Sequence, residues 1–327
     1  MNPIFTRRVA LAALAAACLV AGAPLAQAQP AKFPTKPIRL IAPFAPGGAL
    51  DLIARTAAQV MSEQLGQTVV VENRAGAAGA IGSEFVARAP ADGYTLLLGA
   101  TTTHGINPVL QKLPYDAIKD FAPVSLVATI PHIIVINPQL PVNTIQEFIA
   151  YAKAKPGLTY GSAGTGSPHH LAGEMLKMLA GVNVVHVPYK GSGPAMSDLI
   201  GGQIQFMSIE YTAAAGNLKG GKLKALAVAT PQRVPGIDLP TLAEAGLQGF
   251  EVTAWYAIYA PAGTPPDIVA ALQGALAKGL RSGDARDKLA SLNATAVGST
   301  PEALNTHMRA EMERWGRVIK AANVKPD

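Results

Sequence analysis

Hydrophobic residues gather in short continuous runs along the chain, and glycine, proline and polar residues separate these runs. Short apolar runs bounded by turns are typical of strands that are buried on both faces of a mainly parallel sheet. Such runs predict strands at 37–42, 68–72, 94–99, 123–129, 133–137, 158–162, 184–189, 204–208, 223–230 and 252–261. The pattern therefore predicts a chain that is rich in buried strands.

Segments with the periodicity of a helix lie between several of these runs. Apolar residues recur every three or four positions at 51–65, 144–154, 168–179 and 301–322. The last of these helices should turn an inner face toward the core, formed by Leu304, Met308, Trp315 and Ile319. Because strands alternate with helices along the chain, the predicted fold class is α/β.

Two further sequence features are typical of helix starts. Ser167 followed by Pro168 places a capping residue before a proline at the first helical position. Thr241 and Glu244 have the spacing of a capping box, which predicts that another helix begins there.

The pattern starts again near residue 130. Each half contains a strand, a glycine loop and a helix, with "FAPGGALD" in the first half and "YGSAGTGSPHH" in the second. Extended segments near 127–134 and 252–259 join the halves without a Gly/Ser linker. We therefore expect one lobe of residues 29–129 plus 253–327 and a second lobe of residues 130–252. Domain interfaces and the carboxyl ends of strands are where such folds bind small molecules.

The start of the chain has the composition of an export signal. Arg7 and Arg8 precede an almost wholly apolar run at 9–23, and "AQA" follows as a small-x-small cleavage site. We predict a signal peptide over 1–28, cleaved after Ala28, and a periplasmic location for the mature protein. "TRRVAL" is weakly similar to a twin-arginine signal, but we favour the general secretory route.

Cysteine content limits the chemistry of the mature chain. Cys18 is the only cysteine, and it lies inside the predicted signal peptide. A lipid anchor on Cys18 is disfavoured, because Ala15 stands where a lipobox usually has leucine. The mature chain would then contain no disulfide and no thiol.

The overall composition is that of a folded, exported protein. Hydrophobic residues make up 49% of the 327 residues and charged residues 15%, which excludes a disordered chain. The formal net charge is +6, but the basic residues are scattered, so we expect no nucleic-acid partner. After the signal peptide no apolar stretch is long enough to span a membrane. We expect a soluble monomer.

Nucleotide and hydrolase motifs are absent from the glycine loops. "PGGALD" is not G-x-G-x-x-G, and "GTGSPH" has His169 where the third glycine should stand. No P-loop sequence occurs. "YGSAG" has Tyr160 where the hydrolase motif needs glycine, so we interpret Ser162, Ser167 and Ser192 as loop or capping residues.

Histidines and acidic residues show no metal-binding motif. His169 and His170 are adjacent and would point about 100° apart on a helix, and the remaining histidines are isolated in the sequence. We therefore predict no catalytic residue, no cofactor and no metal.

Capture of a small anion by backbone N–H groups is the chemistry that remains. Gly47 and Gly48 precede a helix whose positive end favours an anion, and residues 164–167 could act in the same way from the other half. Neither loop contains an arginine, which favours a carboxylate held by neutral donors or through water. Thr101 and Thr102 could add hydroxyls. Lys190 either adds charge or is an ordinary solvated lysine.

Five ordered motifs, spread over residues 33–322, resemble one known family. They are "PIRLIAPFAPGGALDLIAR", "VVVENRAGAAGAIGSEFVARAPADGYTLLLG", "LTYGSAGTGSPHHLAGEML", "VPYKGSGPAMSDLIGGQIQFM" and "LPTLAEAGL". The chain resembles the periplasmic solute-binding receptors of tripartite tricarboxylate transporters, also called the Bug (Bordetella uptake gene) family. The resemblance implies a two-lobed periplasmic binding protein of type II, which closes like a Venus flytrap around a small organic acid.

The resemblance also implies how the ligand is held, with one carboxylate at the first glycine loop and ordered water bridging it. Phe44 would lie against the ligand. The first anchoring loop is matched by Gly47, Gly48 and Ala49, and the second by Ala163, Gly164, Thr165, Gly166 and Ser167. Many relatives have an acidic residue shortly after "IQFM", and here Glu210 stands two places later. Either Glu210 supplies that group, or the far end of the ligand is uncharged.

The predicted function is therefore an extracytoplasmic receptor, and not an enzyme, that captures a small organic carboxylate. Its partners would be the membrane subunits of a tripartite tricarboxylate-type transporter. One alternative is a periplasmic sensor that passes its ligand-bound state to a membrane kinase. A periplasmic enzyme on the same scaffold is disfavoured by the missing nucleophile and metal motifs, although fold alone decides neither.

Overall fold

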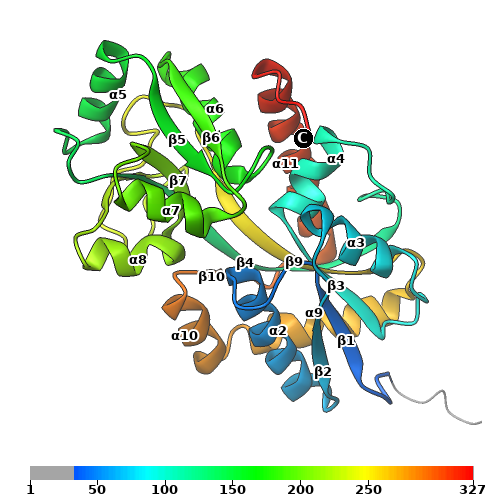
Figure 1. Ribbon diagram of the computed structural model, residues 1–327. Helices are drawn as coiled ribbons and strands as arrows, with labels where there is room; N and C mark the ends of the chain where they lie inside the picture. Colours follow the sequence, from blue (N-terminus) through cyan, green and yellow to red (C-terminus); the bar gives the residue numbers. More distant parts are fainter. Residues whose placement is uncertain (1–32, 327) are drawn as a thin grey trace, which may run out of the picture. The chain divides into compact units, whose positions relative to one another are not determined.

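The computed structural model describes residues 33–326, and the compact unit considered below begins at Lys36 (Figure 1). The predicted signal peptide, its cleavage site after Ala28 and Cys18 all lie outside the described residues. In the part of the chain that the structure describes, no helix combines the length and apolar character needed to cross a bilayer.

The strands correspond closely to the apolar runs of the sequence. They are β1 (Ile38–Ala42), β2 (Val69–Asn73), β3 (Thr95–Ala100), β4 (Phe121–Ile136), β5 (Leu158–Ser162), β6 (Val184–Pro188), β7 (Phe206–Glu210), β8 (Lys224–Val228), β9 (Thr253–Pro261) and β10 (Thr295–Ala296). Ile38, Leu40 and Ile41 of β1 are all fully buried. Since neighbouring residues of a strand point to opposite faces, both faces of β1 are covered, as the continuous apolar runs predicted.

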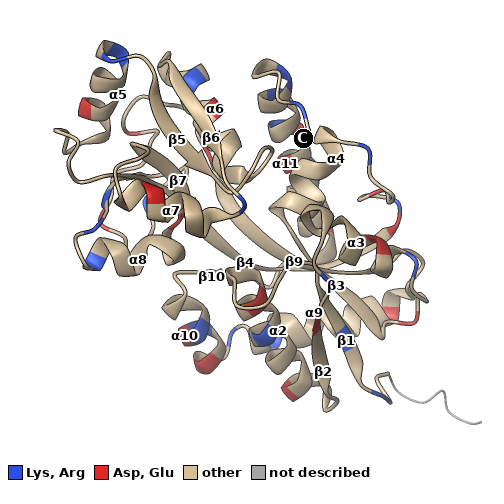
Figure 2. Cartoon of the chain, viewed as in Figure 1, with Lys and Arg blue, Asp and Glu red and all other residues tan. Residues whose placement is uncertain are grey.

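Helices connect most of these strands. They are α2 (Ala49–Leu65), α3 (Ala80–Ala87), α4 (Asn107–Leu110), α5 (Ile145–Ala154), α6 (Pro168–Ala180), α7 (Ser192–Ile200), α8 (Tyr211–Lys219), α9 (Pro266–Gly279), α10 (Gly283–Ser291) and α11 (Pro301–Ala321), with a 3₁₀ turn η1 (Ala77–Gly79) and a π-helix η2 (Thr101–Ile106). Figure 2 shows basic and acidic residues interspersed along the outer helices, in agreement with the scattered charge of the sequence.

The strands form two sheets that share β4. The first sheet has the order β2-β1-β3-β9-β4, with β10 also beside β4, and the second has the order β4-β7-β5-β6, with β8 also beside β4. Within each sheet the three outer strands, β2-β1-β3 and β7-β5-β6, run parallel. Strands β4 and β9 pair antiparallel with their neighbours. The predicted parallel strands are therefore joined by two long antiparallel strands.

Strand β4 is continuous, whereas the sequence predicted two strands, at 123–129 and 133–137. Residues 121–131 pair with β9 in the first sheet, and residues 132–136 pair with β7 and β8 in the second. Pro131 lies where the strand changes partners. A proline cannot donate a ladder hydrogen bond. The chain nevertheless stays extended through this proline and crosses from one sheet to the other.

Helix α11 packs on the cores of both sheets. Near its start, Leu304 and Met308 pack in the hydrophobic core of the first sheet. Near its end, Trp315 and Ile319 pack in the core of the second. All four are buried, which confirms the predicted inner face. The predicted lobe boundaries place all of α11 in the first lobe, whereas its last turns pack in the core of the second sheet.

The predicted capping box at Thr241 forms, but no helix follows it. The Thr241 N–H donates to the Glu244 carboxylate (2.7 Å), and the Glu244 N–H donates to the Thr241 hydroxyl (3.0 Å). Residues 242–246 then make turns, because Gly246 has a φ of +91° and the Leu247 N–H returns to the Leu242 carbonyl. A left-handed glycine after one turn ends a helix before it can extend.

His104, in η2, is a fully buried polar residue that packs against the first sheet. Its ring stacks on Tyr259, with ring centroids 4.1 Å apart, and meets Phe121 edge-on at 4.8 Å. Its Nδ1 lies 2.9 Å from the Thr103 hydroxyl. Burial lowers the pKa of His104 to about 3, so the folded protein keeps this ring neutral.

The neutral state of His104 predicts a loss of stability in mild acid. The unfolded chain takes up a proton on this ring as the pH falls below about 6.5, whereas the folded chain does so only near pH 3. The stabilisation is therefore complete above pH 6.5 and is lost between these values. Between pH 7.5 and pH 5 we expect His104 to account for about 2 kcal/mol of the fall in unfolding free energy.

Urea unfolding of the wild type and of His104→Phe at both pH values measures this contribution. The variant should lose about 2 kcal/mol less than the wild type over that interval. An equal loss in both proteins would show that His104 is not the group that takes up the proton.

Candidate functional site

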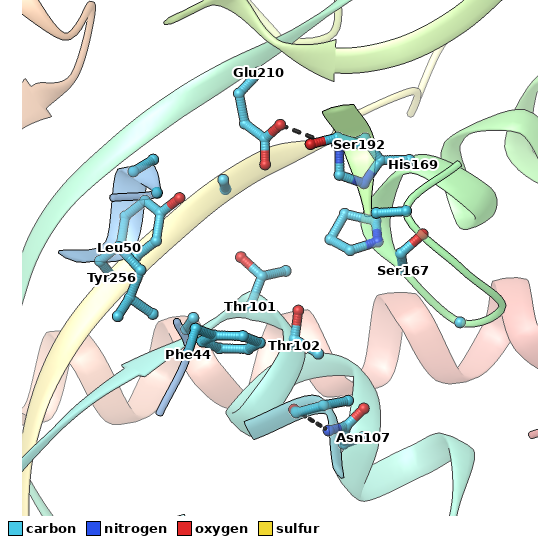
Figure 3. A pocket seen from close by; sticks show the side chains of 18 of the residues that line it. Phe44, Leu50, Thr101, Thr102, Asn107, Ser167, His169, Ser192, Glu210 and Tyr256 are labelled. Carbon is cyan, nitrogen blue, oxygen red and sulfur yellow. Dashed lines mark hydrogen bonds and ion pairs between the residues drawn. The ribbon is translucent and has the colours of Figure 1, made fainter. Parts of the chain in front are cut away.

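A pocket of about 410 Å³ lies where the two glycine loops meet (Figure 3). This volume is in the range of small-molecule sites. The lining residues come from the loops after β1 and β5, from the starts of α2, α4, α6 and α7, from η1 and η2, from the ends of β3 and β7, and from the first part of β9. Two further pockets lie elsewhere, one of about 610 Å³ beside α10 and one of about 540 Å³ beside β1 and α3. No residue of either glycine loop lines them.

Most of the predicted site residues line this pocket. Those that do are Phe44, Gly48, Ala49, Thr101, Thr102, Ala163, Thr165, Gly166, Ser167 and Glu210. Gly47, Gly164 and Lys190 do not line it. Lys190 is exposed, which corresponds to the solvated lysine that the sequence left as an alternative. Their roles in ligand binding remain predictions.

The first glycine loop opens an uncapped helix toward the pocket. Gly48 is the N-cap of α2, with extended φ and ψ of −83° and 174°, and no side chain caps the helix. The first N–H groups of an α-helix have no acceptor within the helix, and they form its positive end. Ala49 and Leu50 both line the pocket. Their backbone therefore offers donors to a small anion.

A network around Asp51 holds this loop in place. The buried Asp51 carboxylate accepts hydrogen bonds from the Gly47 N–H (3.1 Å), Arg55 Nε (3.0 Å) and Asn73 Nδ2 (3.0 Å). Burial raises the pKa of Asp51, but these hydrogen bonds outweigh it and hold the pKa below its usual range. Asn73 also donates to the Phe44 carbonyl (3.1 Å). Asp51 thus braces the helix start, and it also uses the Gly47 N–H, which is no longer a donor for a ligand.

The second glycine loop is satisfied internally. The Gly164 N–H donates to the Ser162 hydroxyl (3.0 Å), the Gly166 N–H to His170 Nδ1 (3.1 Å) and the Ser167 N–H to the Gly164 carbonyl (3.2 Å). Ser167 caps α6, as predicted, by accepting from the His170 N–H. The expectation that this loop presents backbone donors in the same way as the first loop therefore does not hold for these three groups.

Ser162 and His186 have the separation of a nucleophile and its base, at 2.6 Å between Oγ and Nε2. Ser162 is fully buried, however, and it does not line the pocket. Its hydroxyl also contacts the N–H and the carbonyl of Gly164. This geometry favours a residue that shapes the loop, as the sequence analysis interpreted it.

Polar groups of η2, together with Asn107 at the start of α4, form a third side of the pocket. The Thr101 hydroxyl is nearly buried and accepts from the Trp255 N–H (2.9 Å), which ties η2 to β9. Thr102 and Asn107 also line the pocket, and Asn107 Nδ2 donates to the Ala78 carbonyl (3.0 Å). π-Helices occur frequently at functional sites.

The Glu210 carboxylate and the His169 imidazole line the pocket across from Thr101 (Figure 3), and the imidazole of His132 contacts Glu210 without lining the pocket. Glu210 Oε2 lies 3.1 Å from His169 Nε2, and Glu210 Oε1 lies 3.6 Å from His132 Nε2. Burial by itself raises the pKa of Glu210, but the two imidazoles outweigh it and hold the pKa well below its usual range. His132, which the sequence treated as isolated, is fully buried within this group. Within residues 33–326 no group of three or more His, Cys, Asp or Glu is arranged to hold a metal ion.

Sequence reasoning missed several residues of the pocket wall. They are Ala45, Leu50, Ala78, Ala100, Asn107, Pro168, His169, Ser192, Ala254 and Tyr256. Most come from the predicted loops or their immediate neighbours. Ala254 and Tyr256 come from a buried strand, and alternation along that strand gave no indication that this end of it borders a cavity.

Comparison with known proteins assigns the family. Residues 53–324 match the family model of the tripartite tricarboxylate transporter family receptor. The chain belongs to this family. The periplasmic binding protein BugD has a similar structure, with 38% sequence identity and a TM-score of 0.78, over 90% of this chain and 100% of that chain.

Two solved relatives contain organic acids. Rpa4515 of R. palustris, determined with adipate, is 38% identical with a TM-score of 0.82, over 90% of this chain and 100% of that one. MatC of Rhodopseudomonas palustris, with bound malate, is 36% identical with a TM-score of 0.77, over 88% of this chain and 100% of that one. These likenesses confirm the predicted fold, that of a two-lobed α/β periplasmic binding protein.

The Asp51 network predicts that the first loop loses order when the carboxylate is removed. Asp51→Ala should lower the free energy of unfolding by about 2 kcal/mol, because three donors lose a buried, charged acceptor. Asp267→Ala is the matched control, since Asp267 is also an acid in the first turn of a helix but is exposed. The control should change stability by less than about 0.5 kcal/mol in urea unfolding. Equal effects would mean that the network does not stabilise the loop.

Proposed function

We propose that this chain is an extracytoplasmic receptor that captures a small organic carboxylate for a tripartite tricarboxylate-type transporter. The observation that carries the proposal is the uncapped start of α2, which opens into a pocket that no described Lys or Arg lines. An anion in such a pocket is held by backbone N–H groups and the helix dipole. Relatives that hold adipate and malate support an organic acid as the ligand.

The charge of the pocket favours a carboxylate over a phosphate. A phosphate carries more charge and usually takes a lysine or arginine as a partner. The donors available here are the backbone N–H groups at the start of α2 and hydroxyls that line the pocket, such as those of Thr102, Thr165 and Ser192. Water could bridge the carboxylate to groups that it does not reach directly.

The proposal includes the two lobes, the hinge and the place of the protein in the cell. The lobes would be residues 29–129 plus 253–327 and residues 130–252, and they would close on the ligand about the extended segments near 127–134 and 252–259. The change of sheet between Pro131 and His132 supports this division. The chain would reach the periplasm with a signal peptide cleaved after Ala28 and would deliver its ligand to the membrane subunits, without turnover. A sensor that signals to a kinase is the second candidate, and gene neighbours would distinguish the two.

A side chain at Gly48 should block the anion site without disturbing the fold. A Cβ at Gly48 would meet no atom within 4 Å, and the φ of −83° suits any residue. Gly48→Val should therefore fold normally, but its side chain would fill the space in front of the first N–H groups of α2. We expect binding at least about tenfold weaker, which corresponds to about 1.4 kcal/mol.

The ligand for this test comes from a thermal-shift screen of organic acids, since a ligand at 100 times its Kd stabilises by about 2.7 kcal/mol. Calorimetry then compares the wild type with Gly48→Val. The control is Gly283→Val, at the first position of α10, where a Cβ also meets no atom within 4 Å. A folded Gly48→Val protein that binds the acid as tightly as the wild type would contradict the proposed site.

A further inference from the structure

Glu210 presents its carboxylate to the pocket from the end of β7. β7 pairs with β4 such that Glu210 lies opposite His132. The side chain is 18% exposed, and Figure 3 shows the carboxylate directed into the pocket, across from Thr101 and beside Ser192. Glu210 is therefore placed to meet a bound ligand.

Two imidazoles fix the position of this carboxylate. His169, at the second position of α6, approaches Oε2 (3.1 Å), and His132 approaches Oε1 (3.6 Å). His132 is itself fixed by a contact of 3.1 Å between its Nδ1 and the Ser208 hydroxyl. A carboxylate has about four acceptor positions on its two oxygens, so Glu210 can still accept a hydrogen bond from a ligand.

Glu210 is ionised at neutral pH, and its charge extends across the pocket. The adjacent imidazoles hold the pKa of Glu210 well below its usual range despite burial. Burial and, after it, the Glu210 charge raise the pKa of Tyr256, which lines the same pocket. Among the described residues that line the pocket, Glu210 is the only acid and His169 the only base. These two already face each other, so a further negative charge near Glu210 would find no partner.

We propose that Glu210 determines specificity by selecting carboxylic acids whose other end donates a hydrogen bond, such as a hydroxyl, an amide or an ammonium group. The inference rests on the proposed function, in which the first carboxylate of the ligand binds at the start of α2. A second carboxylate that reaches Glu210 would be repelled at short range in a partly buried pocket, where charges interact more strongly than in water. A donor at that end would instead gain a charge-assisted hydrogen bond.

Matched ligands test this inference on the wild-type protein. The dicarboxylates succinate, glutarate and adipate are each compared by calorimetry with the ω-hydroxy and ω-amino acids of the same chain length. At pH 7.5, and at the chain length that binds best, we expect the ω-hydroxy or the ω-amino acid to bind at least tenfold more tightly in Kd than the dicarboxylate. A wild type that binds the dicarboxylate as tightly as both partners, or more tightly, overturns the inference.

The isosteric variant Glu210→Gln should reverse this preference. Removing the charge should strengthen dicarboxylate binding by at least tenfold and weaken binding of the ω-amino acid by a similar factor. Glu210→Asp, which keeps the charge, should keep the wild-type order. Glu313→Gln removes an exposed acid that pairs with Arg317 away from the pocket, and it should change neither Kd. A merely structural role for Glu210 would weaken all ligands together and leave their order unchanged, which also overturns the inference.

Failure of the inference can be distinguished from failure of the proposed function. If carboxylates bind and Gly48→Val abolishes binding, but the order of ligands ignores Glu210, then only the specificity role is wrong. If none of these acids binds the wild type or Glu210→Gln, the proposed carboxylate site fails, and the inference fails with it. Should Glu210→Gln not fold, the ligand order of the wild type alone decides.

Discussion

The antiparallel pairing of β4 with β9 is the constraint on which the site depends. One strand, β4, belongs to both sheets, and its first part is held against β9 from Phe121 to Pro131. The next residue, His132, already pairs with β7, and its partner on that strand is Glu210. The same strand therefore sets the position of Glu210 relative to η2, because the Thr101 hydroxyl of η2 accepts a hydrogen bond from the β9 backbone at Trp255. Helix α11 adds a second connection by packing on both cores.

The two glycine loops resemble each other in sequence but differ in chemistry. The first leaves the start of α2 uncapped and uses Asp51 to hold the loop from behind. In the second loop, Ser167 caps the helix that follows, and a proline stands at the first helical position. The N–H groups of Gly164 and Gly166 donate to partners within the protein. An anion therefore finds backbone donors mainly on one side of the pocket. The other side presents hydroxyls, His169 and Glu210, which suits a ligand with two different ends.

Much of the fold follows from local patterns, because apolar runs and helical periodicity report burial directly. The strands, the α6 cap and the inner face of α11 were predictable for that reason. The two apolar runs at 123–129 and 133–137 form one strand, because the chain stays extended where it changes partners at Pro131. The capping box at Thr241 starts no helix, because Gly246 ends the turn. The residues that line the pocket were predictable where they lie in the glycine loops. The grouping of His132, His169 and Glu210 was not, because these residues come from three elements that only strand register and helix packing bring together.

The central claim is that a carboxylate binds at the open start of α2. The most direct test is to titrate the ¹⁵N-labelled protein with an organic acid that binds it and to follow the assigned backbone amide resonances. The account predicts large downfield proton shifts at Ala49 and Leu50, because their N–H groups acquire a charged acceptor, and small changes at Gly47, Gly164 and Gly166, whose N–H groups already have partners. Unchanged resonances at Ala49 and Leu50 with a saturating acid, and shifts confined to another part of the chain, would contradict it.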